Sequence, residues 1–265
     1  MAEDRETLRE HITLVRTQLL SPIKVDRFSG ASKLAARFER IARDWEAGRA
    51  DASAIVEVVN EIAVAVQLLS LPLTAHFAMI YEPRVTLSGQ SIDFLLAYGD
   101  GKQYFDVKTI MPRDPANTQR AWEKYGELRQ LFPDNASILL AKNLMGGEFW
   151  HYFSSARAKF LDYALGLERK IAALPKGDKQ SIRMVYCTDG FHWRIDQLED
   201  FADFYQNGVF RADDAFAPLQ AHYLTDKCIV IQRTIDGFCC LHRRLIETQP
   251  QTFLVDVQGP NLGRF

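Results

Sequence analysis

The segment that decides the fold is SIDFLLAYGDGKQYFDVK, residues 91–108. Its two halves are rich in aromatic and aliphatic residues, and they flank the turn residues Gly99–Lys102. Apolar runs separated by turn residues are typical of a β-hairpin, and an Asp-Gly step supplies the positive φ angles of a tight turn. The segment therefore predicts strands over residues 91–98 and 103–110, joined by this turn.

The turn also predicts which side chains lie together. A short loop pairs Tyr98 with Gln103, and counting back along both strands then puts Asp93 opposite Lys108. Because side chains alternate between the faces of a strand, Asp93, Asp106 and Lys108 emerge on the same face. Opposed side chains have Cβ atoms about 5 Å apart, so we expect two carboxylates and one ammonium to converge.

Such a cluster suits one kind of chemistry. Two adjacent carboxylates repel each other, which raises the pKa of one of them unless a cation is present. A hard divalent ion such as Mg²⁺ accepts one or two carboxylates together with waters and phosphate oxygens, and it can polarise a phosphate and activate water. With a lysine to stabilise the developing charge, the predicted cluster could hydrolyse a phosphodiester.

The rest of the chain predicts helices and strands around the hairpin. Apolar residues recur at helical spacing in residues 3–20 and 31–47, and Ser53 can cap a third helix that runs to about Ser70 and is apolar almost all round. Further elements are expected as a strand at 76–81, a helix at 117–131, a strand at 137–141, helices at 148–174 and 197–205, and strands at 183–188, 228–233 and 237–242. This order predicts an α/β fold with a mixed sheet flanked by helices.

The hairpin motif resembles that of a known family. Asp93 is followed, after twelve residues, by the DVK element at residues 106–108. This pattern is similar to the motif of the PD-(D/E)XK nuclease superfamily, which includes restriction endonucleases, Holliday-junction resolvases and DNA-repair nucleases. Ile92 replaces the proline of that motif, and Asp106 stands where glutamate is commoner. The family's core of helix, three-strand meander, helix and strand matches the elements expected over residues 53–141.

The resemblance implies a fold and a division of the chain. We expect a restriction-endonuclease-like α/β core over residues 51–145. An N-terminal helical extension over residues 1–50 precedes it, and C-terminal helices and strands over residues 146–265 pack on it.

The resemblance also implies roles for individual residues. Asp93, Asp106 and Lys108 would be catalytic, and Asp93 and Asp106 would hold Mg²⁺ or Mn²⁺. Many family members carry a further acidic ligand on the first core helix, which here is Glu61, with Glu57 one turn earlier as the alternative. Glu61 is preferred because its neighbours on the helical wheel are apolar.

The helix expected after the third strand offers substrate contacts by the same resemblance. Its polar residues are Gln119, Arg120, Lys124 and Tyr125. Acidic residues alternate with the basic ones on this helix, which also fits an ordinary solvated helix face.

Composition restricts the classes of partner. The chain has 265 residues with 32 Lys and Arg against 34 Asp and Glu, a formal net charge of −2. This excludes a protein that wraps duplex DNA through a bulk basic excess, so nucleic acid, with DNA favoured over RNA, would be held by a local site. A charged N-terminus without a signal peptide, and a longest apolar stretch of residues 62–73, predict a cytoplasmic protein without a membrane span. The cysteines lack C-x-x-C spacing and are expected to be buried thiols.

Three functions stay open at this point. The first is a Mg²⁺-dependent endo- or exodeoxyribonuclease. The second is a non-catalytic nuclease-fold subunit that binds or scaffolds a DNA repair or defence assembly. The third is a hydrolase of a small phosphoester or nucleotide. By analogy with the family, a homodimer or a protein partner would accompany the first two.

Overall fold

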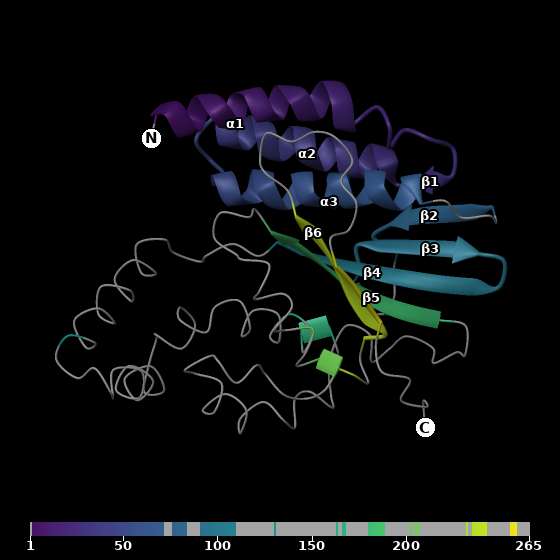
Figure 1. Ribbon diagram of the computed structural model, residues 1–265. Helices are drawn as coiled ribbons and strands as arrows, with labels where there is room; N and C mark the ends of the chain where they lie inside the picture. The colour runs from purple at the N-terminus through teal and green to yellow at the C-terminus, as the bar shows by residue number, and fades with distance from the viewer. Residues whose placement is uncertain are drawn as a thin grey trace.

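The structure is a computed structural model. It describes residues 2–71, 76–83, 91–109, 180–188, 235–242 and 255–258, together with residues 130, 163, 166–167, 202, 205–206 and 232. Within these residues three helices lie on one side of a mixed β-sheet (Figure 1). The described part of the chain thus confirms the mixed α/β class.

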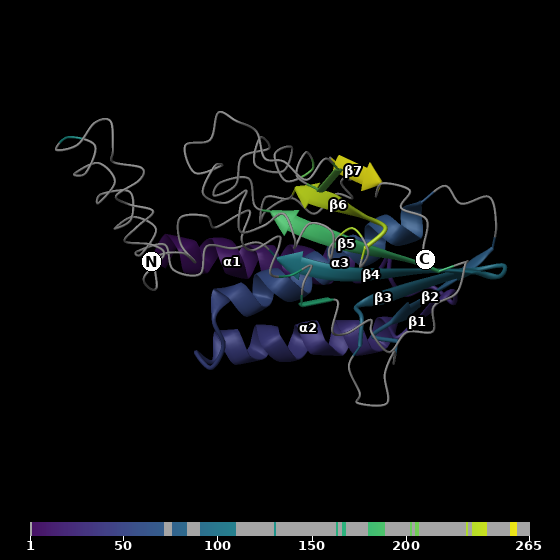
Figure 2. The same ribbon diagram turned by 90° about the horizontal axis from the view of Figure 1, so that it is seen from below.

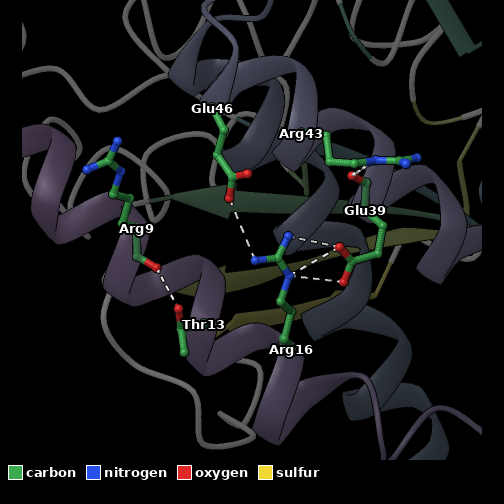
Figure 3. Close-up of polar contacts among 6 residues, drawn as sticks. All are labelled: Arg9, Thr13, Arg16, Glu39, Arg43 and Glu46. Carbon is green, nitrogen blue, oxygen red and sulfur yellow. Dashed lines mark hydrogen bonds and ion pairs between the residues drawn. The ribbon is translucent and has the colours of Figure 1, made fainter.

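The first two helices follow the predicted apolar spacing. Helix α1 spans Ala2–Leu14 and continues as a π-helical stretch, η1, over Val15–Leu19. Helix α2 spans Ala31–Glu46 and begins after Gly30, whose φ of 94° lies in the left-handed region open to glycine. The two helices are tied together by Arg16 of η1, which donates two hydrogen bonds from Nε and one from Nη2 to the carboxylate of Glu39 on α2 (Figure 3).

Helix α3 spans Ala52–Ser70 and lies next to the sheet. Its N-cap residue is Asp51, so the prediction that Ser53 caps it is wrong; Ser53 lies inside the first turn. Most of its side chains are buried, as a helix that is apolar all round requires. Among the described residues it is the one helix long and apolar enough to cross a membrane, but a mostly buried core helix has the same composition.

The described sheet has seven strands, and each lies beside its neighbour in the sequence. They are β1 (Phe28–Ser29), β2 (Phe77–Tyr81), β3 (Phe94–Tyr98), β4 (Gly101–Thr109), β5 (Gln180–Thr188), β6 (Gly237–His242) and β7 (Val255–Gln258). Strands β2, β3 and β4 form the predicted antiparallel meander. The pairs β1–β2, β4–β5 and β5–β6 are parallel, and β6–β7 is antiparallel (Figure 2).

The strand beside β4 is β5, so the sheet continues beyond residue 145. The strand predicted at residues 137–141 and nearly all of the helix predicted at 117–131 lie outside the described residues. Gln232 is helical, which makes the strand predicted at 228–233 wrong at that position, and β1 and β7 were not predicted. The expected strands at 183–188 and 237–242 are confirmed as β5 and β6.

The core fills the space between the helices and one face of the sheet. On the hairpin this face carries Phe94, Leu96, Phe105 and Val107, which join the buried cluster of α1, α2 and α3. Cys187 and Cys239 are buried in the same cluster as free thiols, as predicted for these two cysteines. The other face of β4 is the one that carries Asp106, because side chains alternate along the strand.

Candidate active site at the β3–β4 hairpin

The turn of the hairpin differs from the prediction by two residues. Tyr98 pairs with Gly101, so the loop consists of Gly99 and Asp100. Gly99 has a φ of 55°, which suits the first central position of a type II′ turn, where glycine is favoured. The predicted pairing of Tyr98 with Gln103, and hence of Asp93 with Lys108, is wrong.

The shift leaves the face of each side chain unchanged. A displacement by two residues preserves the alternation of side chains, whereas a displacement by one would reverse it. Phe94 pairs with Phe105. The next residue along each chain segment is Asp93 on one side and Asp106 on the other, so these two lie side by side. The corrected register therefore brings the two carboxylates closer along the strands than the predicted one does.

Asp106 and Lys108 form a buried ion pair on β4. Asp106 is fully buried, and Nζ of Lys108 lies 2.7 Å from its Oδ2. Burial lowers the pKa of Lys108, but attraction by Asp106 and Asp93 outweighs it and the pKa is raised. The lysine therefore carries its positive charge at neutral pH.

Asp93 lies directly before β3, and its Oδ2 accepts a hydrogen bond of 2.6 Å from the backbone N–H of Val107. Burial, followed by repulsion from Asp106, raises the pKa of Asp93 to about 7, and the charge of Glu61 adds to the rise. Lys108 and the Val107 N–H act in the opposite direction. Asp93 therefore keeps its proton to a higher pH than an ordinary aspartate does.

Glu61 of α3, and not Glu57, is the acid next to the hairpin. Glu61 is buried and Glu57 is exposed. On the helix side of the sheet, Oε2 of Glu61 accepts hydrogen bonds from Nη1 of Arg37 and from Oη of Tyr81, the latter 2.8 Å long. Burial raises the pKa of Glu61, although the charge of Arg37 and the Tyr81 hydrogen bond partly offset this effect.

The acidic side chains of the cluster show how well the site fits a divalent cation. Within the described residues, no three His, Cys, Asp or Glu side chains are close enough to form a complete metal cage. The donor set that fits is the pair Asp93 and Asp106, since Mg²⁺ often takes one or two carboxylates and keeps its waters. A cation there would offset the repulsion that raises the pKa of Asp93. Glu61 is already held by Arg37 and Tyr81, so its predicted role as a third ligand stays a prediction.

Several residues around the cluster were not predicted from the sequence. Arg37 and Tyr81 are two of them. The sequence around Arg37 predicts only an amphipathic helix, and the sequence around Tyr81 predicts only a strand. Tyr163 and Tyr186 are close enough to Lys108 and Asp106, respectively, for electrostatic interaction, and burial raises the pKa of Tyr186 well above its usual value. A tyrosine on a buried strand carries no sequence signal that separates a site residue from a core residue.

The predicted substrate contacts are not tested by the structure. Gln119, Arg120, Lys124 and Tyr125 all lie outside the described residues.

No protein-family model matches the chain, and neither the curated proteins nor the solved structures contain a significant match to it.

Proposed function

We propose that this protein is a metal-dependent phosphodiester hydrolase of the PD-(D/E)XK type that acts on nucleic acid, with DNA as the first candidate substrate. The observation that carries the proposal is the convergence of Asp93, Asp106 and Lys108 at the β3–β4 hairpin. A core that only needed to be stable would not require two carboxylates side by side, because burying charge without full compensation is costly.

Asp93 and Asp106 are the residues that would hold the cation. When bound there, Mg²⁺ would polarise a phosphate group and lower the pKa of a water molecule. The protein's own contribution is a fixed arrangement of charge: Val107 N–H orients the Asp93 carboxylate, and Lys108 keeps its proton beside Asp106. The ammonium can then donate a hydrogen bond to a phosphate oxygen as negative charge accumulates on it.

The overall reaction is hydrolysis of a phosphodiester. The oxygen of water bonds to phosphorus, the bond from phosphorus to one sugar oxygen breaks, and that sugar oxygen leaves with a proton as an alcohol. Loss of any one of the three charged residues should lower the rate by removing stabilisation of the charged transition state.

The test is cleavage of single- and double-stranded oligonucleotides in the presence of Mg²⁺ or Mn²⁺. We expect the wild-type protein to cleave and the Asp106→Asn variant to be inactive while its circular dichroism spectrum stays native. A parallel panel of RNA oligonucleotides, mononucleotides and small phosphoesters identifies the substrate class. An Asp106→Asn variant that cleaves as fast as wild type would show that the assigned site is wrong.

A second candidate is a nuclease-fold subunit that binds without turnover. It is favoured by one observation: the cationic groups of the cluster are already paired, Lys108 with Asp106 and Arg37 with Glu61. A purely structural cluster has no need for metal. Calorimetric titration of the wild-type protein with Mn²⁺ separates the two candidates, because only the hydrolase should show binding that disappears in Asp106→Asn.

A further inference from the structure

Three side chains from three different elements form a closed hydrogen-bonded set on the helix side of the sheet, within electrostatic reach of Asp93. Nη1 of Arg37, from α2, donates to Oε2 of Glu61 on α3 and also to Oη of Tyr81 on β2, 2.7 Å away. The Tyr81 hydroxyl in turn donates to the same Glu61 oxygen, 2.8 Å away. Oε2 of Glu61 therefore has two donors, which restrict the carboxylate to one orientation.

The set leaves the other carboxylate oxygen of Glu61 available. Among the described residues, Oε1 of Glu61 accepts no hydrogen bond. A glutamate side chain has several rotatable bonds, so without such restraints it samples many positions. Because Oε2 is held by two donors, Oε1 can occupy fewer positions than it could in a free side chain.

Tyr81 also links this set to Asp93. It pairs with Phe94, the residue after Asp93, and the two aromatic rings have centroids 5.5 Å apart. The next residue, Glu82, has a φ of 47° and donates its backbone N–H to the carbonyl oxygen of Asp93, 2.8 Å away. A non-glycine residue in the left-handed region is strained. The end of β2 thus fixes Tyr81 and the backbone of Asp93 relative to each other.

We propose that Arg37 and Tyr81 are positioning residues for Glu61, which they hold so that Oε1 is directed to the ion or water bound at Asp93 and Asp106. This inference rests on the proposed function. Its consequence is that the N-terminal helical layer forms part of the active site, since Arg37 lies on α2. Groups that orient metal ligands in this way typically contribute ten- to hundredfold to metal affinity or activity.

The alternative is that Arg37 merely joins α2 to the rest of the fold, and the chain offers a matched control for it. Arg16 also ties α2 to another element, through Glu39, and its side chain is 34% exposed against 29% for Arg37. Within the described residues the carboxylates that pair with Arg16 are Glu39 and Glu46 of α2, and neither belongs to the hairpin (Figure 3). The partner of Arg16, Glu39, is 39% exposed and Glu61 is 10% exposed, so Arg37→Met should destabilise the fold more than Arg16→Met, and metal affinity is compared between the two variants in the folded state.

The experiment is a Mn²⁺ titration of the full-length protein without nucleic acid, followed by calorimetry or by the loss of the free-Mn²⁺ electron paramagnetic resonance signal. We expect Arg37→Met to weaken Mn²⁺ binding by about tenfold or more and Arg16→Met to leave it unchanged. Tyr81→Phe should weaken binding in the same direction but less, because Arg37 still holds Glu61. Arg37→Lys, which keeps the charge, should recover part of the affinity. Thermal unfolding of each variant and its cleavage rate at saturating metal are measured as well.

The outcomes are distinguishable. Unchanged Mn²⁺ affinity in a folded Arg37→Met variant, or equal losses in Arg37→Met and Arg16→Met, would overturn the positioning role while wild-type cleavage still supports the proposed function. If Arg37→Met does not fold, Tyr81→Phe and Arg37→Lys decide, and unchanged affinity in both overturns the role. A wild-type protein that neither binds Mn²⁺ nor cleaves would overturn the proposed function, and this inference with it.

Discussion

Replacement of Asp93 by asparagine should change how the stability of the protein depends on pH. Burial and the nearby Asp106 carboxylate raise the pKa of Asp93 from 3.8 to about 7. The folded protein therefore binds a proton more tightly at this site than the unfolded chain does. Stability falls as pH rises wherever the folded state binds more protons, so the Asp93 contribution is lost progressively between the unfolded and the folded pKa values.

The size of this effect follows from the shift. A rise from 3.8 to about 7 is roughly three pKa units, and at about 1.4 kcal/mol per unit this amounts to a loss of stability on the order of 4 kcal/mol. The loss begins above about pH 4 and is complete above about pH 7. Asparagine has nearly the same shape, can still accept the hydrogen bond from Val107, and carries no charge.

The assay is urea unfolding followed by tryptophan fluorescence, with a chelator present, at about pH 5 and about pH 8. The quantity to compare is the difference in unfolding free energy between Asp93→Asn and wild type, because other titrating groups largely cancel in it. Between the two pH values this difference should move in favour of the variant by roughly 2.7 kcal/mol, because about two of the three pKa units lie above pH 5. In a separate measurement without chelator, Mn²⁺ at the higher pH should stabilise wild type more than the variant.

Asp26→Asn is the matched control, since Asp26 is an exposed aspartate in the loop before β1. Because this side chain is exposed, the substitution should change the unfolding free energy by no more than about 0.5 kcal/mol in the assay. A difference for Asp93→Asn that stays constant, or that moves in favour of wild type as the pH rises, would refute the electrostatic description of the carboxylate pair.

Further substitutions test the ion pair and the turn. Lys108→Met should destabilise the protein by about 3–5 kcal/mol in urea unfolding, because it leaves the fully buried Asp106 without its cation. The double variant Lys108→Met/Asp106→Asn should recover much of this loss. A double variant that recovers none of it would contradict a stabilising ion pair between Lys108 and Asp106. Gly99→Ala should cost about 1 kcal/mol, since Gly99 has a φ of 55°. Gly101→Ala should cost less, because its new Cβ would lie 2.8 Å from the ring of Tyr98, and that exposed side chain can shift away. A larger cost for Gly101→Ala would favour the turn at Asp100-Gly101 and contradict the observed register.

The elements that depend on local pattern could be predicted from the sequence. Helices α2 and α3 follow their apolar spacing, and the β2–β4 meander follows from short apolar runs between turn residues. Glu61 was preferred over Glu57 because a helical wheel shows which side of α3 is apolar. Glu61 is indeed the buried one of the two.

The register of the hairpin could not be fixed from the sequence. Gly99-Asp100 and Asp100-Gly101 are both acceptable two-residue turns, and they differ in which glycine takes the positive φ. The choice shifts the pairing by two residues, which is why the predicted faces of Asp93, Asp106 and Lys108 do not depend on it. Their predicted partners across the strands do depend on it, and these were wrong.

Contacts between distant segments carry no local signal. Arg37 precedes its partner Glu61 by 24 residues, and nothing in the spacing of α2 separates it from the other basic residues of that helix. The parallel neighbour of β4 is β5, which comes from residues 180–188, although a strand was expected at 137–141 to complete the core. Such pairings are decided by the packing of the whole chain and not by any one segment.

A crystal structure determined after soaking crystals of the protein in Mn²⁺, with the ion located by its anomalous scattering, tests the proposed metal site directly. We expect a peak bound by the carboxylates of Asp93 and Asp106, beside Lys108, and no such peak in Asp106→Asn crystals grown the same way. Crystals of the wild-type protein that show no peak at these two carboxylates, or in which Mn²⁺ binds only elsewhere, would contradict the proposed metal site.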